Sequence, residues 1–381
     1  MNPLHRREFL QATGVAVAAE LAASTALAGA QDSPAGKIGI GCVGVGGRGT
    51  ALLETVLNIP GIEVRGICDI KPEHVERAQK IVTAKGQPKP LGTPEWKKLL
   101  EGKEIDAVIS ALPCDLHAAN YLDVIAAGKD LYGEKPMCIT PEDCDRVVKA
   151  AEASKQIVQI GFQRRADPRF IESMKLVHSG ELGDLVEGRI MWSNSWGPLY
   201  DWFGKRERSG DWMVEQAIHG WDVMNWAIGS RPVRAVGLGR NDLFRQQQPD
   251  RNVHDYYAAM VEFENGPIVS IVHSWVAPNK FGDEYTRLIG TKAGIDFNTG
   301  MISYRPELKK KDRPAFAGTQ KINSTLMALE AWVESMRNRS TPVATVQQGR
   351  DAVLTCLMIR KAVDTKSAVV REDLSATASK G

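Results

Sequence analysis

The chain has 381 residues, more than one compact core usually holds, so its length predicts two domains. Hydrophobic residues make up 43% and charged residues 25% of the chain, as in ordinary soluble proteins, and the formal net charge is +2. This charge gives no electrostatic reason to expect nucleic acid or an anionic membrane as a partner. The 6 cysteines form no CxxC pair and no metal-finger spacing, so we predict no disulfide and no structural zinc site.

Residues 1–30 are expected to be an export signal. The segment opens His5-Arg6-Arg7-Glu8-Phe9-Leu10, where paired arginines precede Phe-Leu as in a twin-arginine signal. A weakly apolar, alanine-rich run follows, and small residues near position 28 suit a signal peptidase. An ordinary secretory signal is the alternative, but the twin-arginine route exports proteins already folded around a cofactor. No later stretch approaches the length of a membrane span, so we expect a periplasmic or extracellular protein.

Residues 37–160 alternate between strand and helix patterns. The β-branched run at 37–43 ends in glycine and predicts a buried strand. Further strands are expected at 62–68, 107–111, 130–132 and 157–160. Helices are expected between them at 50–57, 72–85, 94–100, 117–127 and 141–154. This alternation predicts an α/β Rossmann domain, a doubly wound parallel sheet with right-handed crossovers.

The pattern changes after residue 160. Strands are expected at 186–194, 235–239, 254–264, 268–276 and 285–289, with Glu264-Asn265-Gly266-Pro267 as a hairpin turn. Helices are expected at 169–178, 212–227, 322–338 and 346–362, with a loop at 195–210. We therefore predict a second α+β domain with a mostly antiparallel sheet at 161–365, for substrate binding and oligomerisation. Its last two helices should pack back on the domain junction, and 366–381 should form a tail.

A glycine-rich loop follows the first strand. The run Gly44-Val45-Gly46-Gly47-Arg48-Gly49 is a GxGxxG motif, whose glycines allow a tight turn and a close approach of backbone to pyrophosphate. Asp69 ends the second strand roughly 20 residues further on, where the dinucleotide fingerprint places an acidic residue. This carboxylate accepts ribose hydroxyls and repels a 2′-phosphate, so NAD is favoured over NADP. The alternative for Asp69 is a cap of the helix that starts near Pro72.

Glu134-Lys135-Pro136 directly follows the fourth strand, at the sheet edge where ligands bind in open α/β sheets. A lysine here donates to a substrate oxygen and assists its proton transfer. The alternative is a surface lysine that precedes a helix. We favour the functional interpretation because of the position at the strand end and the adjacent proline.

His219 lies within the predicted helix 212–227. Glu215 precedes it by four residues and Asp222 follows by three, so helical spacing places all three on one face. A carboxylate beside a histidine orients the imidazole for use as a general base. Ordinary surface pairs are one alternative. A metal site of Glu215 and His219 with His254 or His273 is another, although no spacing demands it and no metal is expected.

Tryptophans are concentrated in part of the second domain, and their faces stack well on sugars, although plain core packing should claim at least half of them. They are Trp192, Trp196, Trp202, Trp212, Trp221 and Trp226. His117 and Gln163-Arg164-Arg165 lie at further strand-to-helix junctions, where they are expected near the substrate.

The chain resembles the glucose–fructose oxidoreductase, inositol dehydrogenase and MocA-like family (Gfo/Idh/MocA) from about residue 37 to about 362. The resemblance rests on the glycine loop, Asp69, the stretch from Ala111-Leu112-Pro113 to His117, Glu134-Lys135-Pro136, His219 and the Phe263-Glu264-Asn265-Gly266 hairpin. It implies that Pro113, His117, Glu134 and Lys135 join the cofactor site, and that Lys135 and His219 take part in proton transfer. Many members have aspartate four residues before that histidine, where this chain has the longer Glu215. Family-like dimers or tetramers are expected by analogy.

The leading hypothesis is oxidation of a sugar or glycoside hydroxyl. His219 would accept the hydroxyl proton, Lys135 would stabilise the alkoxide, and hydride would pass to the nicotinamide. Free NAD should be scarce outside the cytoplasm, so we expect a tightly bound cofactor that a second substrate recycles. The main alternative is a glycosidase that uses NAD for transient ring oxidation, elimination and hydration. A binding or sensory protein that retains NAD structurally is a third, which intact Lys135 and His219 disfavour.

Overall fold

The computed structural model of the chain describes residues 36–199, 201–318 and 320–374. The predicted signal at 1–30 lies outside the described residues, as does the end of the predicted tail. No described helix has the length and apolar character needed to cross a membrane. The six cysteines are all free and buried.

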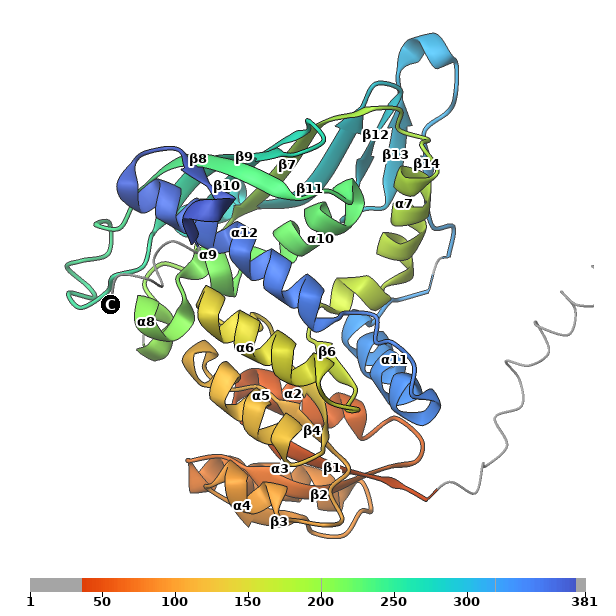
Figure 1. Cartoon of the computed structure of the whole chain (residues 1–381), viewed down its shortest axis with the longest axis vertical. Coiled ribbons are helices and arrows are strands. Elements are labelled where there is room, and N and C mark those ends of the chain that lie inside the picture. Colours follow the sequence, from red (N-terminus) through yellow and green to blue (C-terminus); the bar gives the residue numbers. More distant parts are fainter. Residues whose placement is uncertain (1–35, 200, 319, 375–381) are drawn as a thin grey trace, which may run out of the picture. The chain divides into compact units, whose positions relative to one another are not determined.

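The first sheet is a Rossmann sheet, as predicted. Its strands are β1 (Ile38–Val43), β2 (Ile62–Cys68), β3 (Leu91–Thr93), β4 (Ala107–Ser110), β5 (Asp130–Gly133) and β6 (Val158–Ile160). All pairs are parallel, and the order of these described strands is β3-β2-β1-β4-β5-β6 (Figure 1). The order reverses between β1 and β4, which is where dinucleotides bind in this fold. β1 is buried from its second residue onward, as a strand covered on both faces requires.

Helices between these strands cover the first sheet. They are α2 (Gly47–Val56), α3 (Pro72–Ala84), α4 (Trp96–Leu100), α5 (His117–Ala126) and α6 (Pro141–Glu152). A late helix, α11 (Ser324–Asn338), joins them. Its Leu329 and Trp332 are fully buried in the same core cluster as Leu52 and Leu53 of α2. Although α11 falls within the range assigned to the second domain, it therefore completes the core of the first sheet.

The second sheet is mostly antiparallel, also as predicted. Its strands are β7 (Leu185–Ser193), β8 (Pro232–Arg240), β9 (Tyr256–Phe263), β10 (Ile268–Ser274), β11 (Asp283–Gly290), β12 (Ala293–Asp296), β13 (Met301–Tyr304), β14 (Arg313–Pro314) and β15 (Val369–Val370). Their order is β14-β13-β12-β11-β7-β10-β9-β8-β15, and only β7 and β10, among these described strands, pair in parallel. The expected hairpin turn joins β9 to β10, with Gly266 at φ 107°.

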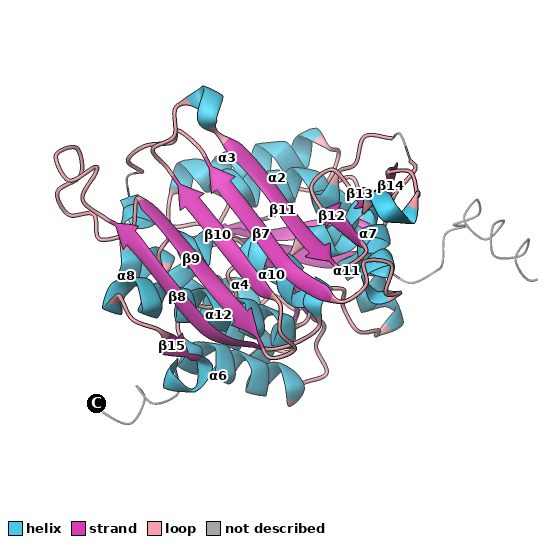
Figure 2. Ribbon diagram, turned by 90° about the horizontal axis from the view of Figure 1, so that it is seen from above, coloured by secondary structure: helices cyan, strands magenta, loops and turns pink. Residues whose placement is uncertain are grey.

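Helices lie on one side of this sheet, α10 and α12 in contact with its strands, and Figure 2 shows the other face in front of them. They are α7 (Pro168–His178), α8 (Arg206–Ser209), α9 (Trp212–Glu215), α10 (Ile218–Ile228) and α12 (Val346–Thr365). α12 packs against β8 and α10 on one side and against α6 on the other, which confirms that this late helix returns to the junction. The expected loop at 195–210 instead contains α8 and a 3₁₀ turn at Asp201–Gly204.

Candidate active site

The glycine loop joins β1 to α2. At two of its positions, nearby backbone atoms leave no room for a side chain. Gly44 has φ +77°, and a Cβ there would lie 2.5 Å from the carbonyl oxygen of Ala111. A Cβ on Gly49 would lie 1.8 Å from the carbonyl oxygen of Gly44. Gly46 and Gly47 are different, because a Cβ on either would meet no atom within 4 Å. The open backbone at Gly46 fits the approach of a dinucleotide pyrophosphate to the start of α2.

Asp69 follows β2 and is hydrogen-bonded to this loop. Its Oδ2 accepts from the backbone N–H of Val45 at 2.9 Å and lies 3.2 Å from His74 Nδ1. Its Oδ1 accepts from the N–H of Lys71 at 3.0 Å. Lys71 itself is the N-cap of α3, so the alternative interpretation of Asp69 as that helix cap is wrong. Asp69 thus lies beside the loop, where the fingerprint requires an acidic residue.

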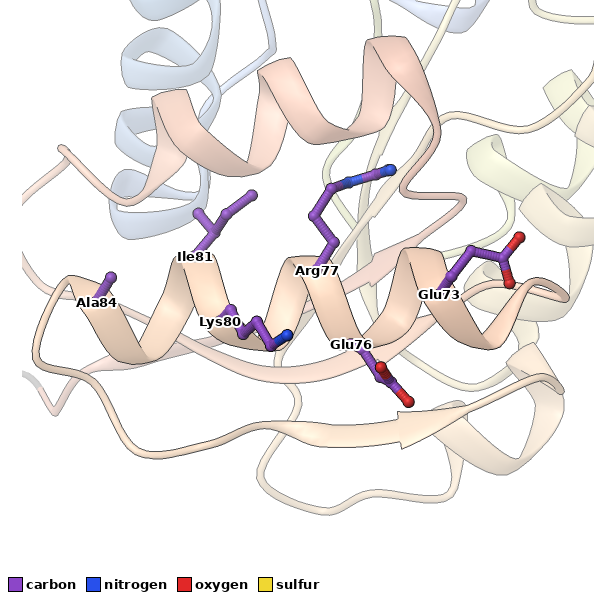
Figure 3. Close-up of a pocket in the computed structure, with 6 residues that line it drawn as sticks. All are labelled: Glu73, Glu76, Arg77, Lys80, Ile81 and Ala84. Atoms are coloured by element: carbon purple, nitrogen blue, oxygen red, sulfur yellow. The ribbon is translucent and has the colours of Figure 1, made fainter.

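Arg77 on α3 binds the carbonyl group of the same residue, Val45. Its Nη2 donates to the carbonyl oxygen of Val45 at 2.7 Å, and Figure 3 shows its side chain leaving α3 on the side of α2. Figure 3 also shows the hollow on α3, which is lined by Glu73, Glu76, Arg77, Lys80, Ile81 and Ala84. All six belong to one helix, so this hollow is a groove in the surface of α3 and contains none of the predicted catalytic residues.

Two of the residues predicted to bind the cofactor, Glu134 and His117, form hydrogen bonds within the protein. Glu134 is buried and accepts from Arg48 Nε at 2.8 Å and from its neighbour's backbone N–H at 3.2 Å. His117 is buried, with Nδ1 2.6 Å from the carbonyl oxygen of Pro136 and Nε2 2.9 Å from that of Leu112. Burial lowers the pKa of His117, so the neutral ring donates to one carbonyl at a time. The contact between His117 and Pro136 stabilises the turn after β5. Pro113 directly precedes the 3₁₀ turn Cys114–Leu116, which follows β4.

Lys135 forms an ion pair with Glu215. Its Nζ donates to Glu215 Oε1 at 2.5 Å and to the Glu215 carbonyl oxygen at 2.6 Å. Burial acts to lower the pKa of Lys135, but the charges of Glu215 and Glu134 outweigh it and raise the pKa above its ordinary value of 10.5. An ammonium has three N–H donors, so one remains for a ligand oxygen.

His219 is buried and has the opposite electrostatic environment. Burial, together with the positive charges of Lys135, Arg164 and Arg48, holds its pKa well below 6.5, so the ring is neutral. The ring stacks on Trp192 at a centroid distance of 6.2 Å. Within the described part of the chain, no hydrogen bond to this imidazole is found, so its nitrogens are left for a ligand.

The expected helix 212–227 is interrupted, and the predicted Glu215–His219–Asp222 face is wrong. α9 ends at Glu215, Gln216 departs to φ −107°, and α10 starts at Ile218. The break turns Glu215 toward Lys135. Asp222 instead forms a buried ion pair with Arg165, at 2.8 Å from Nη2 to Oδ1. The site therefore holds a lysine–glutamate pair and a neutral histidine that has no carboxylate partner among the residues the structure describes.

Arg164 and Glu284 are further site residues. Arg164 lies over the ring of Trp192, 5.6 Å from its centroid, and its Nη2 donates to Glu284 Oε1 at 2.7 Å. Arg164 was expected near the substrate from its strand-to-helix junction, whereas Glu284 was not predicted. Strand register was the available signal, because Glu284 on β11 is the direct partner of Trp192 on β7 and therefore points to the same face.

The tryptophans divide between site and core. Trp192 lies at the site and Trp196 is exposed, whereas Trp212 and Trp221 are buried in the core.

The two histidines considered for a metal site contact other residues. His254 Nδ1 lies 2.8 Å from Asp211, and His273 Nε2 lies 2.7 Å from Gln216. No group of three or more His, Cys, Asp or Glu among the described residues could hold a metal ion.

Comparison with known proteins shows similar relatives of two kinds. A glycosyl hydrolase family 109 protein of Shewanella baltica is 28% identical over 209 residues, which are 49% of this chain and 46% of that protein. The chain thus matches about half the length of that relative. The scyllo-inositol 2-dehydrogenase (NAD(+)) of Bacillus subtilis is 26% identical over 267 residues, 67% of this chain and 75% of that protein.

Solved structures share the fold over most of the chain. The aldose–aldose oxidoreductase of Caulobacter crescentus has a TM-score of 0.76 and 20% identity, covering 88% of this chain and 99% of that one. A probable dehydrogenase of Thermotoga maritima has a TM-score of 0.73 and 21% identity, covering 88% and 100%. Family models match residues 38–162 to the oxidoreductase family with an NAD-binding Rossmann fold, and residues 170–296 to the GFO/IDH/MocA C-terminal domain. As its sequence predicted, the chain belongs to the GFO/IDH/MocA family of oxidoreductases, enzymes with a nicotinamide cofactor.

Proposed function

We propose that this enzyme is exported and transfers hydride between a sugar or glycoside hydroxyl and a tightly bound NAD. The observation that carries this proposal is geometric: Lys135 keeps one N–H free after two donations to Glu215, and His219, stacked on Trp192, has no hydrogen-bond partner among the described residues. Alcohol oxidation needs a donor for the developing alkoxide and an acceptor for its proton. These two residues provide both.

The chain's residues divide the work around a substrate hydroxyl. The free N–H of Lys135 donates to the hydroxyl oxygen and stabilises its negative charge, while Glu215 holds the ammonium in place. A ring nitrogen of His219 accepts the hydroxyl proton. Trp192 offers an apolar face to the C–H side of a sugar ring, and Glu284 with Arg164 offers hydrogen bonds to its other hydroxyls. When bound, the nicotinamide accepts or donates the hydride.

The cofactor is expected to be NAD rather than NADP, and Gly44, Gly46, Gly47, Gly49 and Asp69 would hold it. Asp69 supports NAD because its carboxylate would repel a 2′-phosphate. One relative's name states NAD(+) as its cofactor. Tight binding follows from the proposed export through the twin-arginine signal at 1–30, since a dissociated cofactor would be lost outside the cytoplasm.

Gly46→Ala is expected to abolish cofactor binding without unfolding the protein. The added Cβ meets no atom of the chain within 4 Å, but it occupies the space that the pyrophosphate needs. We expect NAD content, measured after denaturation, to fall at least tenfold, with little change in the unfolding midpoint of the cofactor-free protein. Gly36→Ala is the matched control, because it adds the same methyl group in open space outside the glycine loop and should leave the NAD content unchanged. Equal NAD content in wild type and Gly46→Ala would contradict the assigned site.

The uncovered face of the second sheet supports a homo-oligomer. Apolar side chains on β8, β9 and β10 are exposed, and Leu238 and Met260 are 65% and 49% exposed. Ion pairs of Arg234 with Glu262 and of Arg189 with Glu187 lie on the same sheet, so the surface carries both signs of charge. Contiguous apolar patches of this kind are typical of protein interfaces. We propose that a second copy of the chain packs here, giving a dimer or tetramer.

Leu238→Glu is expected to dissociate this oligomer, because a buried interface would have to desolvate the new carboxylate. Light scattering after gel filtration should show a shift toward the monomer mass. Leu91→Glu, at a 43% exposed position on β3 of the first sheet, should leave the mass unchanged. An oligomer that survives Leu238→Glu would place the interface elsewhere.

A glycosidase that uses NAD transiently is the second candidate, because half of the chain resembles a glycosyl hydrolase family 109 protein. One experiment separates the two. The purified protein is denatured, released NAD and NADP are measured, and the native protein is tested against a panel of sugars and glycosides. Lasting cofactor reduction by particular sugars supports the dehydrogenase. Aglycone release without lasting reduction supports the glycosidase, and failure to bind either dinucleotide would overturn both.

A further inference from the structure

Asp211 has a backbone conformation that side-chain-bearing residues rarely adopt. Its φ is 78° and its ψ is 158°, a region used essentially by glycine alone. The residue is fully buried, so contact with solvent does not explain this backbone conformation. A non-glycine residue persists in such a conformation only where its surroundings fix it, and such residues gather at functional sites.

Three donors bind one oxygen of the Asp211 carboxylate. Its Oδ2 accepts from His254 Nδ1 at 2.8 Å, from the backbone N–H of His254 at 3.2 Å and from Arg206 Nη2 at 3.3 Å. Burial acts to raise the pKa of Asp211, but the hydrogen bond from His254 and the charges of His254, Arg206 and Arg360 outweigh it and lower the pKa. The side chain is therefore an anion held by a segment that precedes β9.

The same residue starts the helix that presents Glu215. The carbonyl oxygen of Asp211 accepts from the N–H groups of Val214 and Glu215, each at 2.9 Å. α9 is a single turn, and its last residue gives Lys135 both a carboxylate and a carbonyl oxygen. A shift at Asp211 is therefore transmitted to Lys135 through one helical turn.

We propose that Asp211 is a positioning residue, which sets α9 so that Glu215 fixes the Lys135 ammonium. Glycine would fit the backbone better, so the chain carries aspartate here for its anchor to His254 and Arg206. The kinetic consequence of this inference rests on the proposed function, whereas the consequence for the Lys135 amine does not.

The test compares Asp211→Gly with wild type in three measurements. Relief of backbone strain offsets the lost hydrogen bonds, so we expect the unfolding midpoint to change by only a few degrees. We expect kcat to fall at least tenfold with KM changed less than threefold. Trace acetylation of the native protein, read by peptide mass spectrometry, should show Lys135 reacting several-fold faster, because loss of the Glu215 contact lowers the pKa that Glu215, Glu134 and Cys114 now raise.

Lys309→Gly is the matched control, since it relieves a positive φ of 51° at an exposed residue and should change neither kcat nor Lys135 labelling. If Asp211→Gly does not fold, Asp211→Asn, which keeps the size but not the charge, serves for the same labelling comparison. Unchanged Lys135 labelling overturns the inference, as does a loss of kcat that only follows a loss of folded protein. Changed labelling in a protein that turns over no sugar would leave the inference standing and refute the proposed function.

Discussion

Replacing Lys135 with methionine is expected to reduce kcat by about 10²–10³-fold, the usual cost of removing one donor to a developing oxyanion. The variant loses the N–H that remains after two donations to Glu215. Binding of NAD, measured by release on denaturation, should persist, because the glycine loop and Asp69 are untouched. Steady-state oxidation of the best sugar from the panel is the measurement.

Two controls separate chemistry from folding in this experiment. Lys135→Met leaves the Glu215 carboxylate without its cation, so the double variant Lys135→Met/Glu215→Gln is needed to restore stability without restoring activity. Lys129→Met removes a lysine whose Nζ donates to a single backbone carbonyl, that of Gly102, and should retain full activity. Turnover within threefold of wild type in Lys135→Met would contradict the catalytic role and favour the alternative of a lysine that only precedes a helix.

The first domain could be predicted from the sequence because its determinants are local. β1 is a short buried run, Gly44 has a positive φ in the turn that follows it, and the backbone oxygen that excludes a Cβ at Gly49 belongs to the nearby Gly44. Strand-then-helix alternation leaves few topologies for a parallel sheet, and the binding edge follows from the strand order. Lys135 could likewise be assigned to the site because its position after β5 depends on topology alone.

The contacts of the site carboxylates could not be predicted, because their partners are far away in the sequence. Helical spacing relates only residues of the same helix. Spacing suggested that Glu215 and Asp222 serve His219, but Lys135 and Arg165 bind these carboxylates from other parts of the fold. The helix break after Glu215 could not be predicted, because no proline or glycine lies at that point. α11 was expected at the domain junction, and only the fold shows that its apolar residues meet α2 of the first domain, because apolar residues fit any core.

His219→Gln is expected to lower kcat/KM by about 10²–10⁴-fold, the range typical of a lost general base. Glutamine keeps a polar side chain of similar reach but has no nitrogen that accepts a proton near neutral pH. The pH dependence of the wild type distinguishes this role from simple packing against Trp192. A base is active when neutral, and the pKa of His219 lies well below 6.5, so kcat/KM should not fall as pH drops through 6.5.

The acid limb should therefore appear only at lower pH, and Lys135, with its pKa raised above 10.5, should give no alkaline limb below that value. Stability has a related dependence with a sign that can be checked. The unfolded chain protonates His219 below about pH 6.5 while the folded protein does not, so stability falls as pH drops from there toward the lower folded pKa. His219→Gln removes this contribution and should flatten that fall, measured by denaturant unfolding between pH 7 and 5. A wild-type acid limb centred at 6.5 would mean that His219 ionises freely, and its assignment as a buried neutral base would be wrong.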